Sequence, residues 1–346
     1  MKFPTFLSLT GLLLLLPTST FALPQQSSKQ STPAKHYNNN NKSKCTAPVK
    51  RVEWRQMRPA DQQSYLDSVL CLKTKPSRIG LNSSTLYDDF AYVHFNLSKQ
   101  IHGCAAFLPW HRYFTLVYEG ALRGECGYKG PMTFWDWTQD NLKLLESPVM
   151  AAKLGFGGQA SSTRTETLRS GSKIKCVDEG PFKNLRPNWI AFSPNEVVQQ
   201  EHCFFRDVID GPNNRDAVAM APAYTAENIR KIQDEEEFYE TFEQQLEGSP
   251  HGVIHASLGG EMNPTTSPNE PLFFLHHPQI DRIWWQWQQK NITERQDQYF
   301  GTKLDAYGFR EGPASLNDVL KMNGLAPDIT VREIMNTADP RWCYTY

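Results

Sequence analysis

The sequence predicts a mainly α-helical fold with long loops and only a few short strands. Residues 59–72 and 226–247 repeat apolar side chains every three or four positions, which is the period of an amphipathic helix. His251 and His255 stand four residues apart, so a helix would place them on one face, one turn apart. The Trp-rich segment 271–287 that follows has the pattern of a further amphipathic helix.

Three helices are expected in the first part of the chain. Pro59 can occupy the first turn of a helix, where its missing N–H is not needed. The apolar stripe of this helix comprises Tyr65, Leu66, Val69, Leu70 and Leu72. Residues 87–93 begin a second helix. Pro109 opens a third helix, which carries His111 and continues to Leu122.

Loops and shorter helices are expected in the rest of the chain. Between residues 148 and 194 the periodicity fades, and Gly- and Ser-rich runs indicate long loops, which are either functional or a surface excursion. The acidic run 234–237 is expected to be a solvated helix face. Residues 316–322 predict a short helix, and residues 331–335 a strand or a short helix. The side chains expected to pack inward from 226–247 are Phe238, Phe242 and Leu246.

The N-terminal 44 residues differ in composition from the rest. A basic residue followed by the apolar run 6–16 predicts a secretory signal peptide over residues 1–22, and hence secretion. The apolar run is too short to span a bilayer, so no membrane anchor is expected. Residues 23–44 are rich in Gln, Ser, Asn and Lys and predict a disordered linker or pro-segment. Residues 45–346 are expected to form one large domain.

Charge and cysteine content narrow the class of protein. The chain has 36 Lys and Arg against 37 Asp and Glu and no basic stripe, so nucleic acid is not an expected partner. Seven cysteines behind a predicted signal peptide favour disulfides; six can pair, one is left over, and the pairing stays open. Asn82 and Asn291 are the better glycosylation candidates, because Asn96 lies between two candidate metal ligands.

Six of the nine histidines fall into two groups of three. The two groups are His94, His102 and His111, and His251, His255 and His277. Three imidazoles can converge on one metal ion, and imidazole suits copper, zinc, iron or nickel. Buried core histidines are the alternative, and a second group of three makes this alternative weaker. His276, beside His277, is expected to face elsewhere on its helix.

Several motifs resemble the copper-binding signatures of the tyrosinase and catechol oxidase family. They are the segment 102–112, the pair His251 and His255, the His-His-x-x-Ile-Asp-Arg-x-Trp run from residue 276, and the Trp-Asp-Trp run at 135–137, in the family's order. The resemblance covers about residues 45–346. It implies a four-helix bundle that holds two copper ions between facing helices. Copper A would bind the first histidine group and copper B the second.

The resemblance also implies an activity. The enzyme would use O2 to oxidise small phenols, namely o-diphenols or o-aminophenols, to quinones. Glu247 matches a family glutamate that holds a basic water, whereas Gly252, directly after His251, has no side chain to hold that water's other side. We therefore expect weaker hydroxylation of monophenols. The alternatives are a true tyrosinase acting on a monophenol or a tyrosine-containing metabolite, a hemocyanin-like O2-binding protein, and a metal-free homologue.

The family further implies structural partners for charged residues. The Tyr-x-Tyr pair at 344–346 is expected to pack on an arginine near the start of the domain, Arg55 or, second, Arg58. Asp281 and backbone carbonyls are candidates to hold the second nitrogen of each imidazole, and Asp281 is alternatively the ion-pair partner of Arg112. A chain that stops at this tyrosine pair is expected of the short, secreted, fungal-type form, without the C-terminal domain of many relatives.

Overall fold

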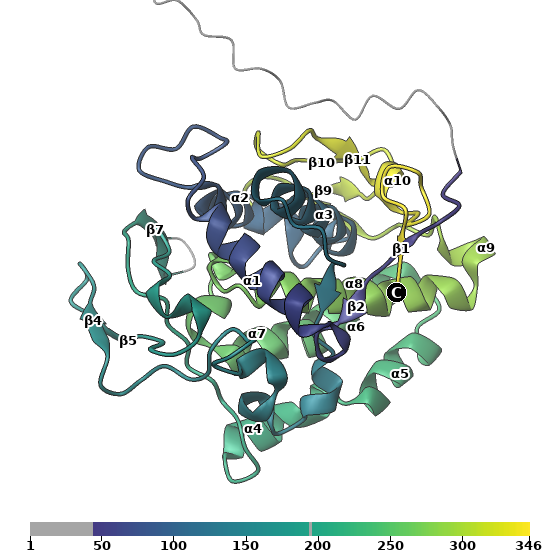
Figure 1. Cartoon of the computed structure of the whole chain (residues 1–346). Coiled ribbons are helices and arrows are strands. Elements are labelled where there is room, and N and C mark those ends of the chain that lie inside the picture. The colour runs from purple at the N-terminus through teal and green to yellow at the C-terminus, as the bar shows by residue number, and fades with distance from the viewer. Residues whose placement is uncertain (1–43, 194–195) are drawn as a thin grey trace, which may run out of the picture. The chain divides into compact units, whose positions relative to one another are not determined.

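The computed structural model describes residues 44–193 and 196–346 (Figure 1). The signal peptide predicted over 1–22 lies outside the described residues, and so does the polar segment predicted over 23–44, apart from Lys44. Helices predominate and the strands are short, as the sequence predicts. No helix in the described part of the chain is long and apolar enough to cross a membrane.

Helices of three kinds build the described chain. The α-helices are α1 (Pro59–Leu72), α2 (Leu86–Ile101), α3 (Phe107–Cys126), α4 (Arg215–Met220), α5 (Ala226–Glu235), α6 (Tyr239–Leu246), α7 (Gly252–Leu258), α8 (Phe273–Lys290), α9 (Ile292–Arg295) and α10 (Val331–Ile334). A π-helical turn, η7 (Glu247–His251), joins α6 to α7. The 3₁₀ segments are η1 (Trp54–Gln56), η2 (Trp137–Asp140), η3 (Leu144–Glu146), η4 (Pro148–Met150), η5 (Pro181–Asn184), η6 (Ala221–Tyr224), η8 (Gly260–Met262) and η9 (Ser267–Asn269).

The strands form two-stranded pairs. They are β1 (Val49–Lys50), β2 (Val52–Glu53), β3 (Thr133–Phe134), β4 (Thr165–Thr167), β5 (Lys173–Lys175), β6 (Trp189–Ser193), β7 (Glu196–Gln199), β8 (Thr302–Leu304), β9 (Arg310–Pro313), β10 (Val319–Leu320), β11 (Ile329–Thr330) and β12 (Tyr344–Thr345). The pairs β1–β12 and β2–β3 are parallel. The pairs β4–β5, β6–β7, β8–β9 and β10–β11 are antiparallel.

Three helices meet at a buried aromatic cluster. The rings of Tyr118 (α3) and Phe274 (α8) stack with centroids 3.5 Å apart, and Phe90 (α2) stands edge-on to both. Such pairs add about 0.5–1.5 kcal/mol beyond the area that they bury. Helix α3 also packs against α1 and along α8. Together with α7 and its π turn, α2, α3 and α8 form the helical bundle that carries the histidines, which confirms the predicted fold class (Figure 1).

Most of the predicted helices are confirmed. Helix α1 begins at Pro59, and the side chains of its predicted stripe are buried or half-buried. Helix α2 spans the predicted second helix, and α3 begins at Phe107, two residues before Pro109. The segment between residues 148 and 188 consists of loops, short 3₁₀ segments and the hairpin β4–β5, as its turn signals predict, and strand β6 follows at Trp189–Ser193.

Two local predictions are wrong. The side chain of Phe238 does not pack inward but is 60% exposed. The helical pattern of 226–247 is interrupted between α5 and α6, and Phe238 caps the start of α6, so the spacing counted across the break does not hold. Residues 316–322 form no helix, because Val319–Leu320 pairs with β11 as a strand.

Three disulfides join distant parts of the described chain. They are Cys45–Cys343, Cys71–Cys126 and Cys176–Cys203. The remaining cysteine, Cys104, is free and buried. Six paired cysteines and one left over are what the sequence predicts. Closing a loop of this kind stabilises a domain mainly by restricting its unfolded chain.

The tyrosine pair packs on Arg51, so the prediction of Arg55 or Arg58 is wrong. Strand β1 runs parallel to β12, which places Arg51 beside the chain end. Its guanidinium group lies 3.8 Å from the ring centroid of Tyr344 and donates to the hydroxyl of Tyr346 at 2.8 Å. Arg55 stands beyond β2 in η1 and pairs with Glu53 and Asp140 instead.

Asp281 is the buried carboxylate at the centre of this region. It forms an ion pair with Arg112 and a second one with Arg51, and it accepts hydrogen bonds from the hydroxyls of Tyr344 and Tyr346, each at 2.6 Å. These cations and hydroxyl donors outweigh burial and lower the pKa of Asp281, although burial alone would raise it. The predicted ion pair with Arg112 is confirmed, and this carboxylate ties α8 to α3 and to both ends of the domain.

Asp281→Asn is expected to lower the free energy of unfolding by about 3–5 kcal/mol, because it leaves the buried guanidinium group of Arg112 without a carboxylate and that of Arg51 with Glu119 alone. Urea denaturation measures the change. Asp297→Asn is the matched control, since this aspartate is exposed and forms no ion pair within the described chain; its effect should stay below about 0.5 kcal/mol. Equal effects of the two substitutions would contradict the role given to Asp281.

Candidate metal centre

The first histidine group lies where α2 ends and α3 begins. His94 is on α2, His102 caps the C-terminus of α2 in extended backbone (φ −128°, ψ 147°), and His111 is on α3. One ring nitrogen from each lies within 4.8 Å of the others. The Nε2 atoms of His94 and His111 are 3.4 Å apart. The structure therefore brings together the three residues that the sequence groups.

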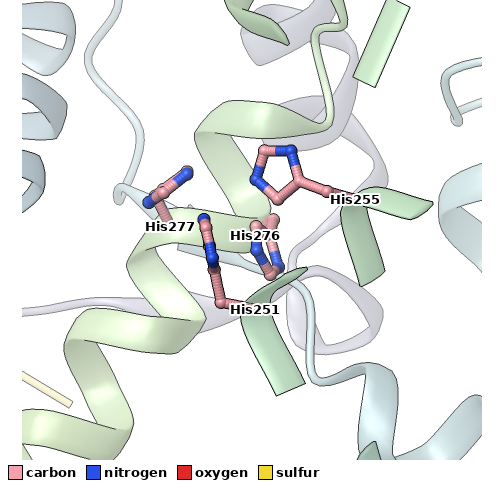
Figure 2. A group of neighbouring side chains, drawn as sticks. All are labelled: His251, His255, His276 and His277. Atoms are coloured by element: carbon pink, nitrogen blue, oxygen red, sulfur yellow. The ribbon is translucent and has the colours of Figure 1, made fainter. Parts of the chain in front are cut away.

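The second group comes from two segments of the chain. Pro250 lies inside the π turn η7 and has no N–H to continue an α-helical ladder, and the wider turn ends at His251. His255 follows on α7, whereas His276 and His277 lie on α8. Figure 2 shows the four rings gathered in one place, and one nitrogen from each lies within 4.8 Å of the others. The prediction that His276 faces elsewhere on its helix is therefore wrong, because its ring enters the same cluster as that of His277.

The two groups face each other across the bundle. The rings of His111 and His277 stack with centroids 4.3 Å apart and planes 9° from parallel. His102 and His251 stack more loosely, with centroids 6.3 Å apart. The ring of Phe273 packs against His277 at 4.1 Å and supplies an apolar wall. The six predicted ligands thus form one continuous cluster.

Backbone carbonyls fix the ring orientation of five predicted ligands. The five bonds run from Nδ1 to a carbonyl oxygen: His94 to Thr265 (2.6 Å), His102 to Ser98 (3.0 Å), His111 to Phe107 (2.8 Å), His251 to Glu247 (3.1 Å) and His255 to Met262 (2.6 Å). A neutral imidazole that donates from Nδ1 keeps a lone pair on Nε2. This is how proteins commonly orient metal-ligating histidines. Five Nε2 lone pairs are therefore available at the centre of the cluster.

Trp137 distinguishes His276 from its neighbour His277. The indole Nε1–H donates to Nδ1 of His276 at 3.2 Å, so Nδ1 carries the lone pair and we assign the proton to Nε2. A ring in this state has no free lone pair for a metal. Among the described residues, both buried ring nitrogens of His277 have no hydrogen-bond partner, whereas His276 lacks one only at Nε2. The geometry therefore favours His277 as the third nitrogen ligand of the second group.

Burial favours the neutral form of all six imidazoles, which is the form that binds metals. Burial is the largest influence on the pKa of His102 and of His255, and it lowers each to about 4. Burial also lowers the pKa of the other four predicted ligands well below the usual value, and the neighbouring rings add to this effect. Neutral imidazoles with free lone pairs are the donor set expected of a metal site.

A single loop, residues 259–269, orients one histidine of each group, because it supplies both the Met262 and the Thr265 carbonyl. A buried pair holds this loop, with Nε2 of His202 lying 2.6 Å from Oε1 of Glu261. Burial opposes a charge on His202, but the attraction and hydrogen bond of Glu261 outweigh burial and raise the pKa of the imidazole. Sequence reasoning missed this pair, since 59 residues separate its members and neither belongs to a motif.

Glu247 links the two histidine groups through the backbone. Both of its carboxylate oxygens lie 2.9 Å from the N–H of Gly103, the residue after His102. One turn earlier, Glu243 is buried, and burial together with the adjacent Glu247 carboxylate raises the pKa of Glu243. Glu247 itself is not among the described residues that line the neighbouring cavity, which His94, His102, His251 and His255 border.

The histidine cavity has a volume of about 290 Å³. Its walls include four of the predicted ligands, Gly252 and part of the loop 259–269. Gly252 has helical backbone (φ −60°, ψ −33°), and a Cβ atom there would contact only the carbonyl oxygen of Glu247, at 3.4 Å. Close packing therefore does not demand glycine at this position, and a side chain there would become part of the cavity wall.

Comparisons with known proteins agree with this arrangement. A family model described as the common central domain of tyrosinase matches residues 84–290, which include all six predicted ligands. Tyrosinase-like protein phomQ1 of Diaporthe leptostromiformis is 37% identical over 314 residues, which cover 87% of this chain and 78% of that protein. Tyrosinase ustQ of Aspergillus flavus is 36% identical over 302 residues, which cover 87% and 80% of the two chains.

Solved structures show the same fold. A variant of polyphenol oxidase from Thermothelomyces thermophila superposes with a TM-score of 0.70 at 25% sequence identity, covering 86% of this chain and 88% of that one. A helical bundle that places two histidine groups face to face defines the class of type-3 copper proteins. Within that class, the chain belongs to the tyrosinase family.

Glu261→Gln tests the buried pair that holds the loop 259–269. Because the pKa of His202 is raised in the folded state, the contribution of the pair to stability is complete below the pKa of an unfolded histidine, about 6.5. This contribution is lost as the pH rises through the raised pKa of the folded state. The substitution should therefore lower the free energy of unfolding by about 1.5–3 kcal/mol at pH 6. The deficit should shrink towards pH 9 in parallel denaturation curves of the two proteins. A deficit that is constant over this range would contradict a charged His202.

Proposed function

We propose that the protein is a copper oxidoreductase that oxidises o-diphenols or o-aminophenols with O2. The observation that carries the proposal is the two facing sets of three imidazoles, whose free nitrogens converge while their other nitrogens are mostly held by carbonyls. Copper accepts such all-imidazole sets. His94, His102 and His111 would hold one ion, and His251, His255 and His277 the other.

Copper, when bound, would supply the redox and O2 chemistry, and the chain supplies position and environment. The carbonyl bonds keep the rings in one orientation, so little reorganisation is needed when the ions bind. Phe273 and Phe107 pack on the rings and exclude water from the inner side of the site. The cavity lined by Gly252 and four of the histidines leaves the substrate an approach to the rings.

The proposed preference for o-diphenols rests on proton transfer. Hydroxylation of a monophenol requires a base that takes the phenolic proton directly or through one held water. We propose Glu247 as the residue that would hold such a water. Its carboxylate already accepts the Gly103 N–H, and Gly252 offers no second group to hold the water. A true tyrosinase activity is therefore the less supported alternative.

Secretion is proposed on two grounds. The N-terminal 22 residues have the composition of a signal peptide. The described chain contains three disulfides, which form and persist in oxidising compartments.

O2 uptake by the copper-loaded protein tests the proposed function. Catechol and o-aminophenol should each drive O2 consumption without delay, and tyrosine should do so more slowly and after a lag. Reversible O2 binding that persists in the presence of excess catechol would instead indicate a hemocyanin-like carrier. A protein that takes up much less than two coppers per chain would indicate a homologue that has lost the metal site.

His277→Ala is expected to lower the copper content from about two ions to about one per chain and to abolish oxidation, because three imidazoles are needed to hold each ion. His276→Ala is the matched control on the same helix. It should keep about two ions per chain, since its ring is engaged by Trp137. Metal analysis after copper loading measures the copper content of both variants. Equal copper loss in the two variants would show that the third ligand has been assigned to the wrong histidine.

Gly252→Asn should raise the rate of monophenol hydroxylation relative to catechol oxidation by about tenfold or more, within the range that one positioned proton-transfer group contributes. The added side chain has space and would hold the second side of a water bound by Glu247. The gain should disappear in the Glu247→Gln background. A parallel fall of both rates in Gly252→Asn, accompanied by a lower melting temperature, would mean that glycine serves packing instead.

A further inference from the structure

The loop 259–269 separates two cavities. Asn263 and Pro264 line the histidine cavity and also a second, larger cavity of about 510 Å³. Cavities that bind small molecules commonly have volumes of about 300–1,000 Å³. A molecule whose aromatic ring occupies the histidine cavity would have to pass Asn263 and Pro264 to reach the larger one.

The second cavity has a fixed wall. Arg206 lines it and is buried; its guanidinium group pairs with Glu270 and donates to the carbonyls of Gly157 and Gly158. Strand β5, residues 173–175, also lines it and is joined to the Arg206 segment by the disulfide Cys176–Cys203. The shape of the cavity is therefore set by a buried ion pair and a covalent link.

The charge of this cavity favours an anion. Lys173 and Lys175 line it, are exposed, and lie within ion-pair distance of no carboxylate among the described residues. Glu166, on the facing strand β4, is engaged by Arg186. The charge of Arg206 is matched by Glu270, so Asp207 is the one acidic side chain left in the lining, against two lysines.

Apolar surface lies beside this charge. Phe205 lines the same cavity and is half-buried. An occupant should therefore combine an apolar linker with a terminal negative charge. Two separate ammonium groups act as point charges, and a carboxylate can pair with them without the geometry of an arginine fork.

We propose that this cavity, the Lys173–Lys175 cavity, binds the side chain of the phenolic substrate, and that the side chain ends in a carboxylate. The substrate is then a catechol or aminophenol carrying an apolar linker and a carboxylate, larger than catechol itself. This inference rests on the proposed oxidation at the histidine cluster, and it adds a recognition site that the oxidation does not require.

A homologous series of catechols tests the proposal. The compounds carry alkyl chains of increasing length that end in a carboxylate or in its methyl ester, and 4-methylcatechol serves as the short reference. The wild-type copper enzyme should prefer the carboxylate over the ester by about tenfold or more in kcat/KM at one chain length. The preference should lie mainly in KM and weaken with added salt. Short peptides with an N-terminal catechol residue and a free C-terminus distinguish a peptide carboxylate from an alkyl carboxylate.

Charge reversal tests whether Lys173 and Lys175 cause the preference for the carboxylate. Lys173→Glu with Lys175→Glu should lower kcat/KM for the preferred carboxylate by about tenfold or more and leave 4-methylcatechol within twofold. Lys129→Glu with Lys143→Glu makes the same change of net charge at exposed lysines outside this cavity. Equal losses in both double variants, or the absence of any carboxylate preference in the wild type, would overturn the proposal.

A binding measurement separates this inference from the proposed function. Calorimetry with the non-oxidisable phenyl analogue of the preferred carboxylate should show weaker binding to the Lys173→Glu/Lys175→Glu protein than to the wild type by about tenfold. If catechol is not oxidised at all, the proposed function fails, and this measurement still decides whether the cavity recognises the carboxylate. If catechol is oxidised and the analogue binds both proteins equally, the cavity proposal alone fails.

Discussion

The hydrogen bond from a histidine Nδ1 to a backbone carbonyl is the interaction on which the site depends. It recurs at five of the six predicted ligands and fixes which nitrogen carries the proton. Since burial keeps the rings neutral, each Nε2 holds a lone pair that faces the other ligands. The Nε2 atoms of His94 and His111 approach to 3.4 Å, an arrangement that suits a shared cation.

The surrounding structure keeps those carbonyls in place. Three of the five belong to the helical turn that precedes the histidine, and the other two belong to the loop 259–269, which the His202–Glu261 pair anchors. Glu247 joins the backbone after His102 to the turn that carries His251. Asp281 holds α8 against α3 and against the domain's two ends. A disturbance at any of these anchors should therefore reach the rings through their carbonyl partners.

The sequence predicted much of this arrangement and left out what depends on tertiary contact. Histidine spacing and flanking motifs identified both groups, apolar periodicity located the helix at Pro59, and the position of Pro109 located the helix that carries His111. Arg51 was missed because the parallel pairing of β1 with β12 decides which arginine meets the tyrosine pair. Phe238 was misplaced because a break between two helices leaves no periodic signal. The Trp137 bond that distinguishes His276 from His277 joins residues 139 positions apart.

The most direct test of the account is a crystal structure of the copper-loaded protein with anomalous scattering measured at the copper edge. Two peaks are expected, one among His94, His102 and His111 and the other among His251, His255 and His277, with Nε2 as the bonded atom in the five carbonyl-held rings. His276 should remain bonded to Trp137. A single peak, coordination through a carbonyl-bound Nδ1, or a copper bound by His276 would contradict the assignment.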